Sequence, residues 1–405
     1  MKKLIRVTSV PLSLSKLLGN QLSYMNTFYE VTAVSSDAEE LAKLAQKFGV
    51  RHFPVEMTRQ ITPVQDLVAI YKLYLFFRKE KPAIVHSHTP KAGLVAMLAA
   101  WLARVPVRLH TVGGLPLVEA TGIKRKILNL VETVIYGAAT RVYPNSSALR
   151  EIIIKEKFCA PAKLKIIAQG SSNGIDTAHF SPTQVSAETR QNLRDILQIK
   201  ADDFVFLFVG RLVRDKGINE LVSAFTALEK SPQSVLNIPP SGEILNDLTS
   251  AAPPHSKPKL LLVGPLEQHL NPLSPETIKT IEDNPSIIAT GFEDDVRPYM
   301  AISDAFVFPS YREGFPNVVL QAGAMELPTI VTDINGCNEI IRDRQNGLVI
   351  PPKNPDALLS AMQEMMREHN LPTFLIRNLR KEIEEKYDQQ KVWAAIKEEY
   401  ERLTS

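Results

Sequence analysis

The chain has 405 residues, 44% of them hydrophobic, and a formal net charge of +3. This length predicts two or three domains, and the apolar content is sufficient for packed cores. The two cysteines, Cys159 and Cys337, lie far apart and form neither a disulfide framework nor a metal-ligand pattern, so we expect a reducing compartment. The longest apolar run, residues 92–103, has 12 residues and is too short to span a bilayer. Because Arg6 and Lys16 interrupt any signal-like segment, we expect a cytoplasmic protein.

The charge is unevenly distributed along the chain. Residues 1–150 contain 20 Lys and Arg against 9 Asp and Glu, a balance of +11, whereas residues 151–405 contain 27 against 35, a balance of −8. Such asymmetry predicts that one domain faces an anionic surface, either nucleic acid or the inner leaflet of a membrane. Since no nucleic-acid motif accompanies the charge, we favour peripheral association with the inner face of the plasma membrane and expect no nucleic-acid partner.

Strand and helix patterns alternate along the first 170 residues, which predicts a doubly wound parallel sheet. The expected strands are 4–7, 29–34, 50–53, 83–86, 107–109, 141–143 and 163–168, and the expected helices are 38–48, 63–79, 91–103, 121–139 and 147–157. Residues 11–20 are expected to form the loop and helix entry after the first strand. Gly19 lies in this loop, where a single glycine is a weak phosphate signal and more often makes a turn.

Three histidines follow neighbouring strands of this sheet. His86 and His88 alternate along one strand end, so we expect at most one of them to face a cleft while the other packs against a helix. His110 follows the next strand. No Asp, Glu or Cys lies nearby in the sequence to complete a ligand set, so we expect no metal site. For His88, burial as a neutral residue and a functional role at the cleft remain equally open.

Residues 121–139 predict an amphipathic helix whose first turn is basic. The apolar positions on one face are Ile123, Ile127, Leu130, Val131 and Val134. Lys124, Arg125 and Lys126 crowd the first turn, where cations oppose the helix dipole. The cluster therefore suggests contact with anionic headgroups or with the pyrophosphate group of a ligand, while a solvated basic turn remains the alternative.

A second domain begins after the Gly- and Ser-rich segment 169–176. The unbroken apolar strand 204–209 is followed by Gly210 and Arg211, and then by Lys216 and Gly217 at the start of a helix expected over 218–228. Arg211 supplies a planar fork of hydrogen-bond donors, and Lys216 supplies a point charge. Both suit a diphosphate, and both would stabilise the negative charge that develops when a diphosphate is the leaving group. Further strands are expected at 259–263 and 286–289, separated from that helix by a Pro- and Ser-rich stretch, 231–258, that predicts an inserted mobile surface loop.

The stretch from residue 304 to 352 carries the strongest signal. A buried strand at 305–308 is followed by Glu313-Gly314-Phe315-Pro316, which opens a helix before the strand 329–331. A helix N-terminus at the carboxyl end of a parallel strand is a phosphate site, so the amides of Asn317, Val318 and Val319 are the expected donors. Glu313 would be repelled by phosphate and is expected to accept hydrogen bonds from hydroxyl groups. Phosphate beside sugar hydroxyls indicates a nucleotide sugar.

The sequences EGFPNVVLQAGAMELP, TDINGCNEII and NGLVIPP resemble the C-terminal half of family-4 glycosyltransferases, retaining and metal-independent enzymes of the GT-B fold. The similarity is greatest to bacterial members that build capsular, exopolysaccharide or lipid-linked glycans, and it extends over nearly the whole chain. In the family, seven residues separate this Glu from a second Glu, and at that second position this chain has Gln321. An amide carbonyl there still accepts a hydrogen bond from the donor ribose, without charge assistance.

The resemblance implies roles for further residues. Gly19 would approach the donor phosphate or the acceptor, His110 the transferred sugar, and the loop at Phe292 the nucleotide base. Phe315 and Pro316 would line the donor site with the helix amides. Asp294 and Asp295 suggest the metal-binding pair of the other glycosyltransferase fold, but Arg211 and Lys216 already neutralise phosphate, so no metal or other cofactor is expected.

The expected organisation is two Rossmann-like domains facing each other across a cleft. Residues 1–176 would form the acceptor-binding domain, 177–385 the nucleotide-sugar domain, and 386–405, after a charged tail from 370, a last helix that packs back on the first domain through Val392, Ile396, Tyr400 and Leu403.

The predicted function is retaining transfer of a hexose or N-acetylhexosamine from a nucleotide sugar, most plausibly UDP-linked, to a glycan or polyprenyl-pyrophosphate-linked acceptor. The catalytic residues would be Glu313, His110, Arg211 and Lys216, with His88 and residues 124–126 on the acceptor or membrane side. The alternatives are a UDP-sugar epimerase of the same fold, whose acidic and histidine set we do not find here, and a non-catalytic nucleotide-sugar or membrane-binding subunit. Gln321, and Glu326 where glycine is usual, are the hints for the latter.

Overall fold

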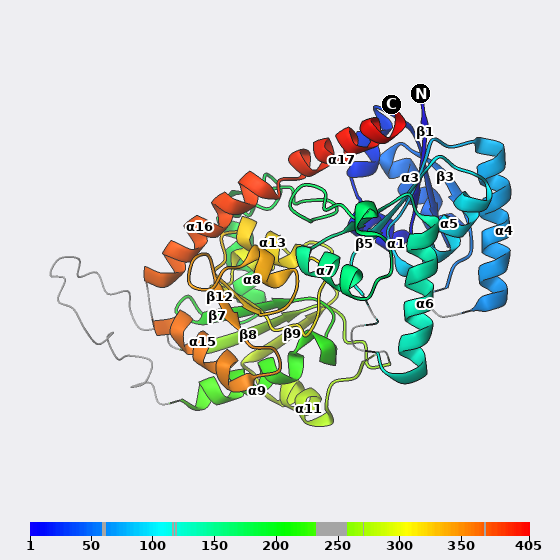
Figure 1. The fold of residues 1–405 in the computed structure, drawn as a ribbon. Coiled ribbons are helices and arrows are strands. Elements are labelled where there is room, and N and C mark those ends of the chain that lie inside the picture. Colours follow the sequence, from blue (N-terminus) through cyan, green and yellow to red (C-terminus); the bar gives the residue numbers. More distant parts are fainter. Residues whose placement is uncertain (59–61, 116, 118–119, 232–256, 270, 368–369) are drawn as a thin grey trace. The chain divides into compact units, whose positions relative to one another are not determined.

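A computed structural model describes residues 1–58, 62–115, 117, 120–231, 257–269, 271–367 and 370–405 (Figure 1). The chain divides into two compact units, which we call the N-domain, Met1–Gly174 with Gln389–Ser405, and the C-domain, Ile175–Asp388. Apart from its ends, the insertion predicted at 231–258 lies outside the described residues.

The N-domain contains a six-stranded, fully parallel sheet of order β3-β2-β1-β4-β5-β6. Its strands are β1 Lys3–Val7, β2 Glu30–Ser35, β3 Arg51–Pro54, β4 Ile84–Ser87, β5 Val107–Val112 and β6 Arg141–Pro144. Its helices are α1 Pro11–Leu17, α2 Gln21–Asn26, α3 Ala38–Phe48, α4 Pro63–Glu80, α5 Pro90–Leu102, α6 Gly122–Ala138, α7 Ser147–Lys155 and α17 Gln389–Thr404. The strand order reverses between β1 and β4, and in open parallel sheets ligands bind at the carboxyl ends of strands at such a switch point.

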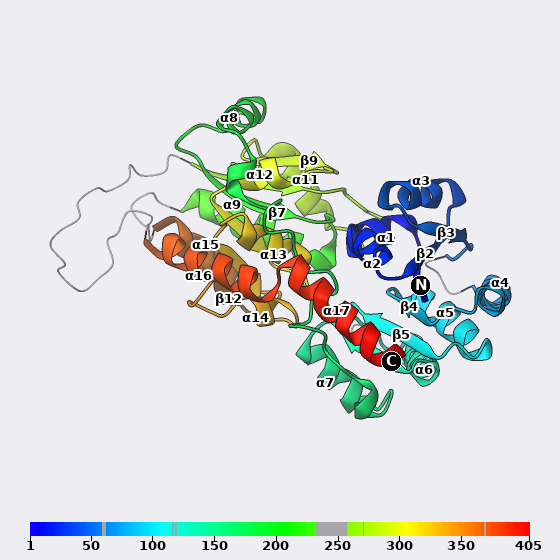
Figure 2. The same cartoon turned by 90° about the horizontal axis from the view of Figure 1, so that it is seen from above.

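Helices cover both faces of this sheet because successive residues of its strands are apolar on both sides. Leu4 packs in one core with residues of α1, α2 and α17, whereas Ile5 and Val7 pack in the other with residues of α4, α5 and α6. Figure 2 shows α1 to α3 on one side of the sheet and α5 and α6 on the other. The last helix belongs to this domain, since Val392, Ile396 and Tyr400 are buried in the first of these cores.

The C-domain repeats this plan with a sheet of order β12-β11-β10-β7-β8-β9, all parallel. Its strands are β7 Phe204–Val209, β8 Pro258–Val263, β9 Ile287–Gly291, β10 Ala305–Phe308, β11 Thr329–Thr332 and β12 Leu348–Ile350. Its helices are α8 Ala187–Ile196, α9 Ile218–Lys230, α11 Pro275–Asp283, α12 Arg297–Ala301, α13 Asn317–Ala324, α14 Cys337–Ile340, α15 Pro355–Arg367 and α16 Asn370–Lys386. Here the strand order reverses between β7 and β10.

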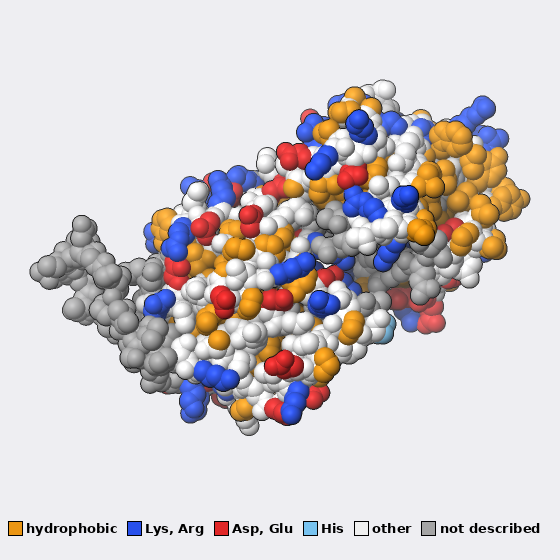
Figure 3. Space-filling view, turned by 60° about the horizontal axis from the view of Figure 1, so that its bottom comes forward, with side chains coloured by type: hydrophobic (Ala, Val, Ile, Leu, Met, Phe, Trp, Pro, Cys, Tyr) orange, Lys and Arg blue, Asp and Glu red, His pale blue; other side chains and the backbone are white. Residues whose placement is uncertain are grey.

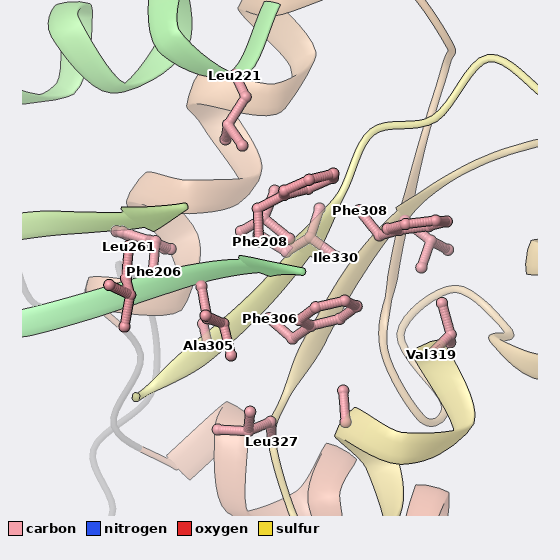
Figure 4. Packing of buried hydrophobic residues seen from close by; sticks show 14 of the residues in the cluster. Phe206, Phe208, Leu221, Leu261, Ala305, Phe306, Phe308, Val319, Leu327 and Ile330 are labelled. Carbon is pink, nitrogen blue, oxygen red and sulfur yellow. The ribbon is translucent and has the colours of Figure 1, made fainter. Parts of the chain in front are cut away.

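The C-domain core is rich in aromatic residues from the two central strands. Phe206 and Phe208 of β7 and Phe306 and Phe308 of β10 are all buried, with the rings of Phe208 and Phe308 stacked at 6.0 Å between centroids. Helices approach these strands from opposite sides, as Figure 4 shows for Leu221 and Val319. Such a core fixes the ends of β7 and β10, from which the loops of the candidate site emerge.

One local prediction is wrong, and two are incomplete. Residues 11–17, expected as a loop and helix entry, form helix α1 throughout, because Pro11 supplies a preset first turn. Residues 163–168 form no strand; Lys165 donates one backbone hydrogen bond to Val142, and the pairing stops there. The charged tail from residue 370 contains α16, whose apolar positions at four-residue spacing, Leu375, Leu379 and Ile383, are buried.

Candidate active site

Two loops meet at the C-domain switch point, one after β7 and one after β10. Gly217, at the start of α9, has φ +73°, and a Cβ there would lie 2.0 Å from the carbonyl oxygen of Pro309. Only glycine permits this backbone approach. The backbone N–H of Tyr311 also donates to the carbonyl of Asp215 at 2.9 Å. The sequence of each loop therefore fixes it against the other, at the position where α/β folds bind phosphate-bearing ligands.

An ion pair between Lys216 and Glu313 joins these loops, and both side chains are largely buried, at 17% and 16% exposure. Glu313 is held on two further sides. The Ser310 hydroxyl donates to its carboxylate at 2.8 Å, and the amide of Asn335 donates to its backbone carbonyl. The structure thus places a fixed carboxylate directly beside a cation, with hydrogen-bonding capacity left for hydroxyl groups.

Arg211 lies at the start of the same loop but outside this pair. Its side chain is 45% exposed and donates to Glu267 at 3.1 Å. A second ion pair, Arg312 with Asp215 at 3.0 Å, links the loop after β10 back to the loop after β7. The two cations predicted to bind phosphate therefore have different surroundings: Lys216 is in a largely buried ion pair, and Arg211 is in a solvent-accessible one.

The helix α13 begins at Asn317 with Pro316 as its N-cap, immediately after these charged residues. The N–H of Val319 donates to the Pro316 carbonyl at 3.1 Å, so of the three predicted donors the amides of Asn317 and Val318 are those of the first turn that the helix itself leaves unpaired. Gln321 is partly exposed one turn further along.

Two aromatic residues assigned to the donor site have opposite environments. The Phe315 ring is buried in the core at 5.4 Å from the Tyr387 ring, so this residue offers the site its backbone only. Phe292 is 57% exposed and, with residues of α8 and α12, lines a C-domain cavity of about 520 Å³.

In the N-domain the histidines divide between the two faces of the sheet. The expectation that His86 and His88 point in different directions is wrong, because residues two apart on a strand share a face; their ring centroids are 4.1 Å apart. His110 is on the other face, where its Nδ1 is 2.8 Å from the Ser87 hydroxyl and its ring fills the space over Gly93 of α5.

All three histidines are buried, and burial lowers the pKa of each. For His110 the pKa falls to about 3, so its imidazole is neutral at physiological pH. Any part that His110 or His88 has in sugar or acceptor binding, which remains a prediction, would therefore be that of a neutral ring. In His86 the ring nitrogens are occupied by the hydroxyls of Tyr400, at 2.5 Å, and Thr111, at 2.8 Å.

A fully buried arginine, which the sequence patterns did not single out, lies beside these rings at the N-domain switch point. Arg6 of β1 donates to His88 Nε2 at 3.0 Å and to Gln21 Oε1 at 2.6 Å, while its Nη1 and the Nδ1 of His88 have no hydrogen-bond partner among the described residues. These groups adjoin a cavity of about 10 Å³, room for roughly one water molecule. A guanidinium without a carboxylate partner in the part of the chain described gives this edge a positive potential.

The remaining predicted N-domain residues lie at helix ends. Gly19, with φ +49°, follows α1, and its N–H donates to the carbonyl of Leu14, as in a helix C-terminal motif. In the first turn of α6, Lys124 and Lys126 are exposed, whereas Arg125 pairs with Glu156 at 2.8 Å and also donates to the Leu117 carbonyl.

The residues that sequence reasoning missed are those that hold others in place. Ser310, Asn335 and Asp215 lie in the loops that follow β10, β11 and β7, so a polar residue in the loop after a strand is the signal that could have found them. Arg6, in contrast, occupies a position expected to be a strand interior, and its partners come from distant segments.

The described residues contain neither a metal-ligand cluster nor a membrane-spanning helix. No group of three or more His, Cys, Asp or Glu residues in the described ranges is arranged to hold a metal ion. Across the same part of the chain, every helix is too short or too polar to cross a membrane.

Comparison with known proteins agrees with this architecture. Residues 189–382 match the family model for glycosyl transferases group 1, and residues 23–170 match that for the glycosyl transferase 4-like domain. The chain is 29% identical to the capsular polysaccharide biosynthesis glycosyltransferase CapM of Staphylococcus aureus, over 98% of this chain and 97% of CapM. It is 30% identical to the UDP-Gal:alpha-D-GlcNAc-diphosphoundecaprenol alpha-1,3-galactosyltransferase of Escherichia coli, over 83% of this chain and 80% of that enzyme.

Among solved structures, Anabaena HepE in complex with UDP and glucose superimposes with a TM-score of 0.78 over 99% of this chain and all of HepE, at 16% identity, which shows the fold. The two matched family models cover both domains, and the two enzymes named above are a capsular polysaccharide biosynthesis glycosyltransferase and a galactosyltransferase whose substrate is a diphosphoundecaprenol-linked sugar. The chain therefore belongs to the GT-B glycosyltransferases of the group-1 and 4-like type, close to those that build capsular and lipid-linked glycans.

Proposed function

We propose that the protein transfers a hexose or N-acetylhexosamine from a UDP-sugar to a polyprenyl-pyrophosphate-linked acceptor, with retention of configuration and without a metal ion. The observation that carries this proposal is the buried Lys216–Glu313 pair at the C-domain switch point, which puts a cation and a hydroxyl acceptor side by side. The similarity to an enzyme that uses UDP-Gal and a diphosphoundecaprenol substrate, and to a structure that holds UDP and glucose, supports the choice of donor and acceptor.

On the donor side, Lys216, Arg211 and the amides of Asn317 and Val318 would bind the diphosphate. As the sugar leaves, negative charge increases on the diphosphate, and these donors stabilise that charge without reorganisation. Fixed cations would thus do what a metal ion does in other transferases. Gln321 would accept a hydrogen bond from the ribose.

Glu313 would bind hydroxyl groups of the transferred sugar. Its carboxylate is oriented by Ser310 and Lys216, so it needs little rearrangement to accept hydrogen bonds from a sugar. We place no nucleophile in the N-domain: the leaving diphosphate would accept the proton of the acceptor hydroxyl on the face from which it departs, which gives retention.

The acceptor would bind at the N-domain. The uncompensated charge of Arg6 and the +11 balance of residues 1–150 favour a substrate that carries phosphate groups. A lipid-linked acceptor is presented at the cytoplasmic leaflet, so we propose that the protein works as a peripheral protein on an anionic membrane surface.

The donor is tested by calorimetric titration with UDP, GDP, ADP and dTDP in the presence of EDTA. We expect UDP alone to bind with high affinity. Comparable binding of all four nucleotides, or binding of UDP that EDTA abolishes, would contradict the proposed donor or its metal independence.

Two variants test the roles of the ion pair. Lys216→Ala should weaken UDP binding, because it removes a cation and leaves Glu313 unpaired beside the phosphates. Glu313→Ala should retain UDP binding, because Lys216 remains.

Two further measurements test the reaction itself. Incubation of the UDP-sugar without acceptor should leave the sugar unchanged; its conversion would favour an epimerase. The anomeric configuration of the product, measured by NMR, tests retention.

A further inference from the structure

Helices α4, α5 and α6 lie next to one another on one face of the N-domain sheet (Figures 1 and 2). The outer surface of α4 is apolar over more than three turns. Five residues, 48–75% exposed and spaced along one helix face, form what we call the α4 stripe: Val64, Leu67, Val68, Tyr71 and Leu75. A second apolar face of the same helix, with Ala69, Leu73 and Phe77, packs in the core. Helix α4 therefore has two apolar faces: one packs in the core, and the other, the α4 stripe, is exposed to solvent.

The outer surface of α6 has the same character. Ile123, Ile127 and Leu130, 42–78% exposed and one turn apart, form what we call the α6 stripe. The face of α6 that packs in the core carries Ile135 and Tyr136 instead. The apolar face that the sequence predicted for this helix is thus largely exposed to solvent. Figure 3 shows hydrophobic side chains gathered over the surface formed by α4.

The exposed charges on α4 and α6 themselves have a single sign. The carboxylates of α4 are engaged: Asp66 pairs with Lys91 at 2.6 Å, and Glu80 pairs with Lys3 and Arg51. Glu132, the carboxylate of α6, is buried. The exposed charged residues of α4 and α6 are all cations, namely Lys72, Arg78, Lys79, Lys124 and Lys126.

This combination identifies the occupant of the surface. Apolar stripes bordered by Lys and Arg are what binds a helix to the interface of an anionic bilayer, where the apolar groups enter the acyl boundary and the cations meet headgroups. A second copy of the chain using the same face would bring cations against cations, which is unfavourable in a symmetric interface.

We propose that the α4 and α6 stripes insert into the anionic leaflet and, with Lys124 and Lys126, form the membrane-docking face of the protein. This inference deepens the proposed function, since it rests on an acceptor presented at a membrane. It also changes the role of the basic first turn of α6: Arg125 is fixed to Glu156, and the two neighbouring lysines assist apolar insertion.

The test is sedimentation with vesicles that contain no acceptor, made of phosphatidylglycerol and phosphatidylcholine or of phosphatidylcholine alone. The unmodified protein should bind only the anionic vesicles. Leu67→Ser/Tyr71→Ser should weaken partitioning by about tenfold or more, and Lys124→Ser/Lys126→Ser by roughly fivefold for each cation removed. The matched control is Ile196→Ser/Phe374→Ser, which removes two similarly exposed apolar side chains from the C-domain and should bind like the unmodified protein.

Unchanged vesicle binding by both stripe and lysine variants would overturn the proposal. So would a dimer of the unmodified protein, measured by light scattering, that Leu67→Ser/Tyr71→Ser converts to a monomer, because the stripe would then bind a second copy. The replaced residues are exposed, so circular dichroism should show each variant folded. Vesicle binding with no transfer from any nucleotide sugar would refute the proposed function but support the docking face. Transfer to a detergent-dispersed acceptor without vesicle binding would support the proposed function but refute the docking face.

Discussion

The two sheets have the same topology, but the polar residues at the carboxyl ends of their strands are arranged in opposite ways. We call these two regions the C-domain edge and the N-domain edge. At the C-domain edge, charged residues are paired in short loops: Lys216 with Glu313, and Arg312 with Asp215. At the N-domain edge, the polar residues are buried and largely hydrogen-bonded to one another, but the charge of Arg6 has no carboxylate partner in the described chain and lies beside neutral imidazoles. The first arrangement can exchange its partners for a charged ligand, whereas the second is a fixed scaffold whose charge acts at a distance.

The largest effect that we expect at the C-domain edge comes from replacing Glu313. Glu313→Ala should lower transfer by about 10²- to 10³-fold, the usual cost of losing one preorganised group at a reacting centre. UDP affinity, measured by calorimetry, should change only a few-fold because Lys216 remains. Glu364→Ala, which breaks an ion pair with Arg344 in the same domain, is the control and should transfer at nearly the original rate. Equal losses of transfer and UDP binding in Glu313→Ala would show that Glu313 serves the nucleotide instead.

The buried histidines predict that the N-domain is the more acid-sensitive half. His110 has a pKa of about 3 in the folded protein and about 6.5 when unfolded, so it binds its proton only in the unfolded chain as pH falls below 6.5. Stability is therefore fully present above pH 6.5 and is lost progressively down to about pH 3. At pH 5 this residue alone lowers the free energy of unfolding by about 2 kcal/mol.

Tryptophan fluorescence isolates this effect, because both tryptophans of the chain, Trp101 and Trp393, are in the N-domain. Urea unfolding followed by fluorescence should show the loss between pH 8 and pH 5. His110→Phe should be less stable at pH 8, since it loses the Ser87 contact, but should show a smaller difference between the two pH values. An unchanged pH dependence in this variant would assign the acid sensitivity to other groups.

The contrast between the C-domain edge and the N-domain edge also explains which parts of the structure could be predicted from the sequence. The sequence indicated that Lys216, Glu313 and the start of α13 would lie close together, because they are in the loops that follow β7 and β10, where local spacing determines their positions. The topology of both sheets followed for the same reason, from alternating strand and helix periods.

The N-domain edge was not predictable, because Arg6, Gln21, His88 and Tyr400 come together only through tertiary packing. A charged residue within a strand pattern gives no sign that it will be buried. The exposure of the α6 stripe was hidden for a related reason: periodicity shows that a helix has an apolar face, but not whether the core or a partner covers it.

A smaller effect tests the link between the N-domain edge and the last helix. The Tyr400 hydroxyl lies 2.5 Å from His86 Nδ1, and the side chain is fully buried. Tyr400→Phe should lower the free energy of unfolding by about 1 kcal/mol, as expected for one buried hydrogen bond, measured by tryptophan fluorescence in urea. Tyr299→Phe in the C-domain is the control and should leave the fluorescence transition in place. A Tyr400→Phe protein as stable as the original would mean that this hydrogen bond contributes nothing to holding the helix.

The smallest expected effect concerns Glu326, at a position where the resemblance to family-4 glycosyltransferases implies glycine. Glu326 has φ +60°, a left-handed conformation that costs a side-chain-bearing residue about 1 kcal/mol. Its pairing with Arg380, at 3.5 Å and 46% exposure of the glutamate, offsets little of this cost. Glu326→Gly should therefore leave stability unchanged or raise it by up to about 0.5 kcal/mol, since relief of strain is partly cancelled by the greater freedom of glycine in the unfolded chain. Glu326→Ala, which keeps the strain and loses the ion pair, is the matched variant. If both variants lost the same stability in thermal unfolding, the ion pair rather than the backbone would be what this position contributes, and its departure from glycine would be a stabilising feature of this chain.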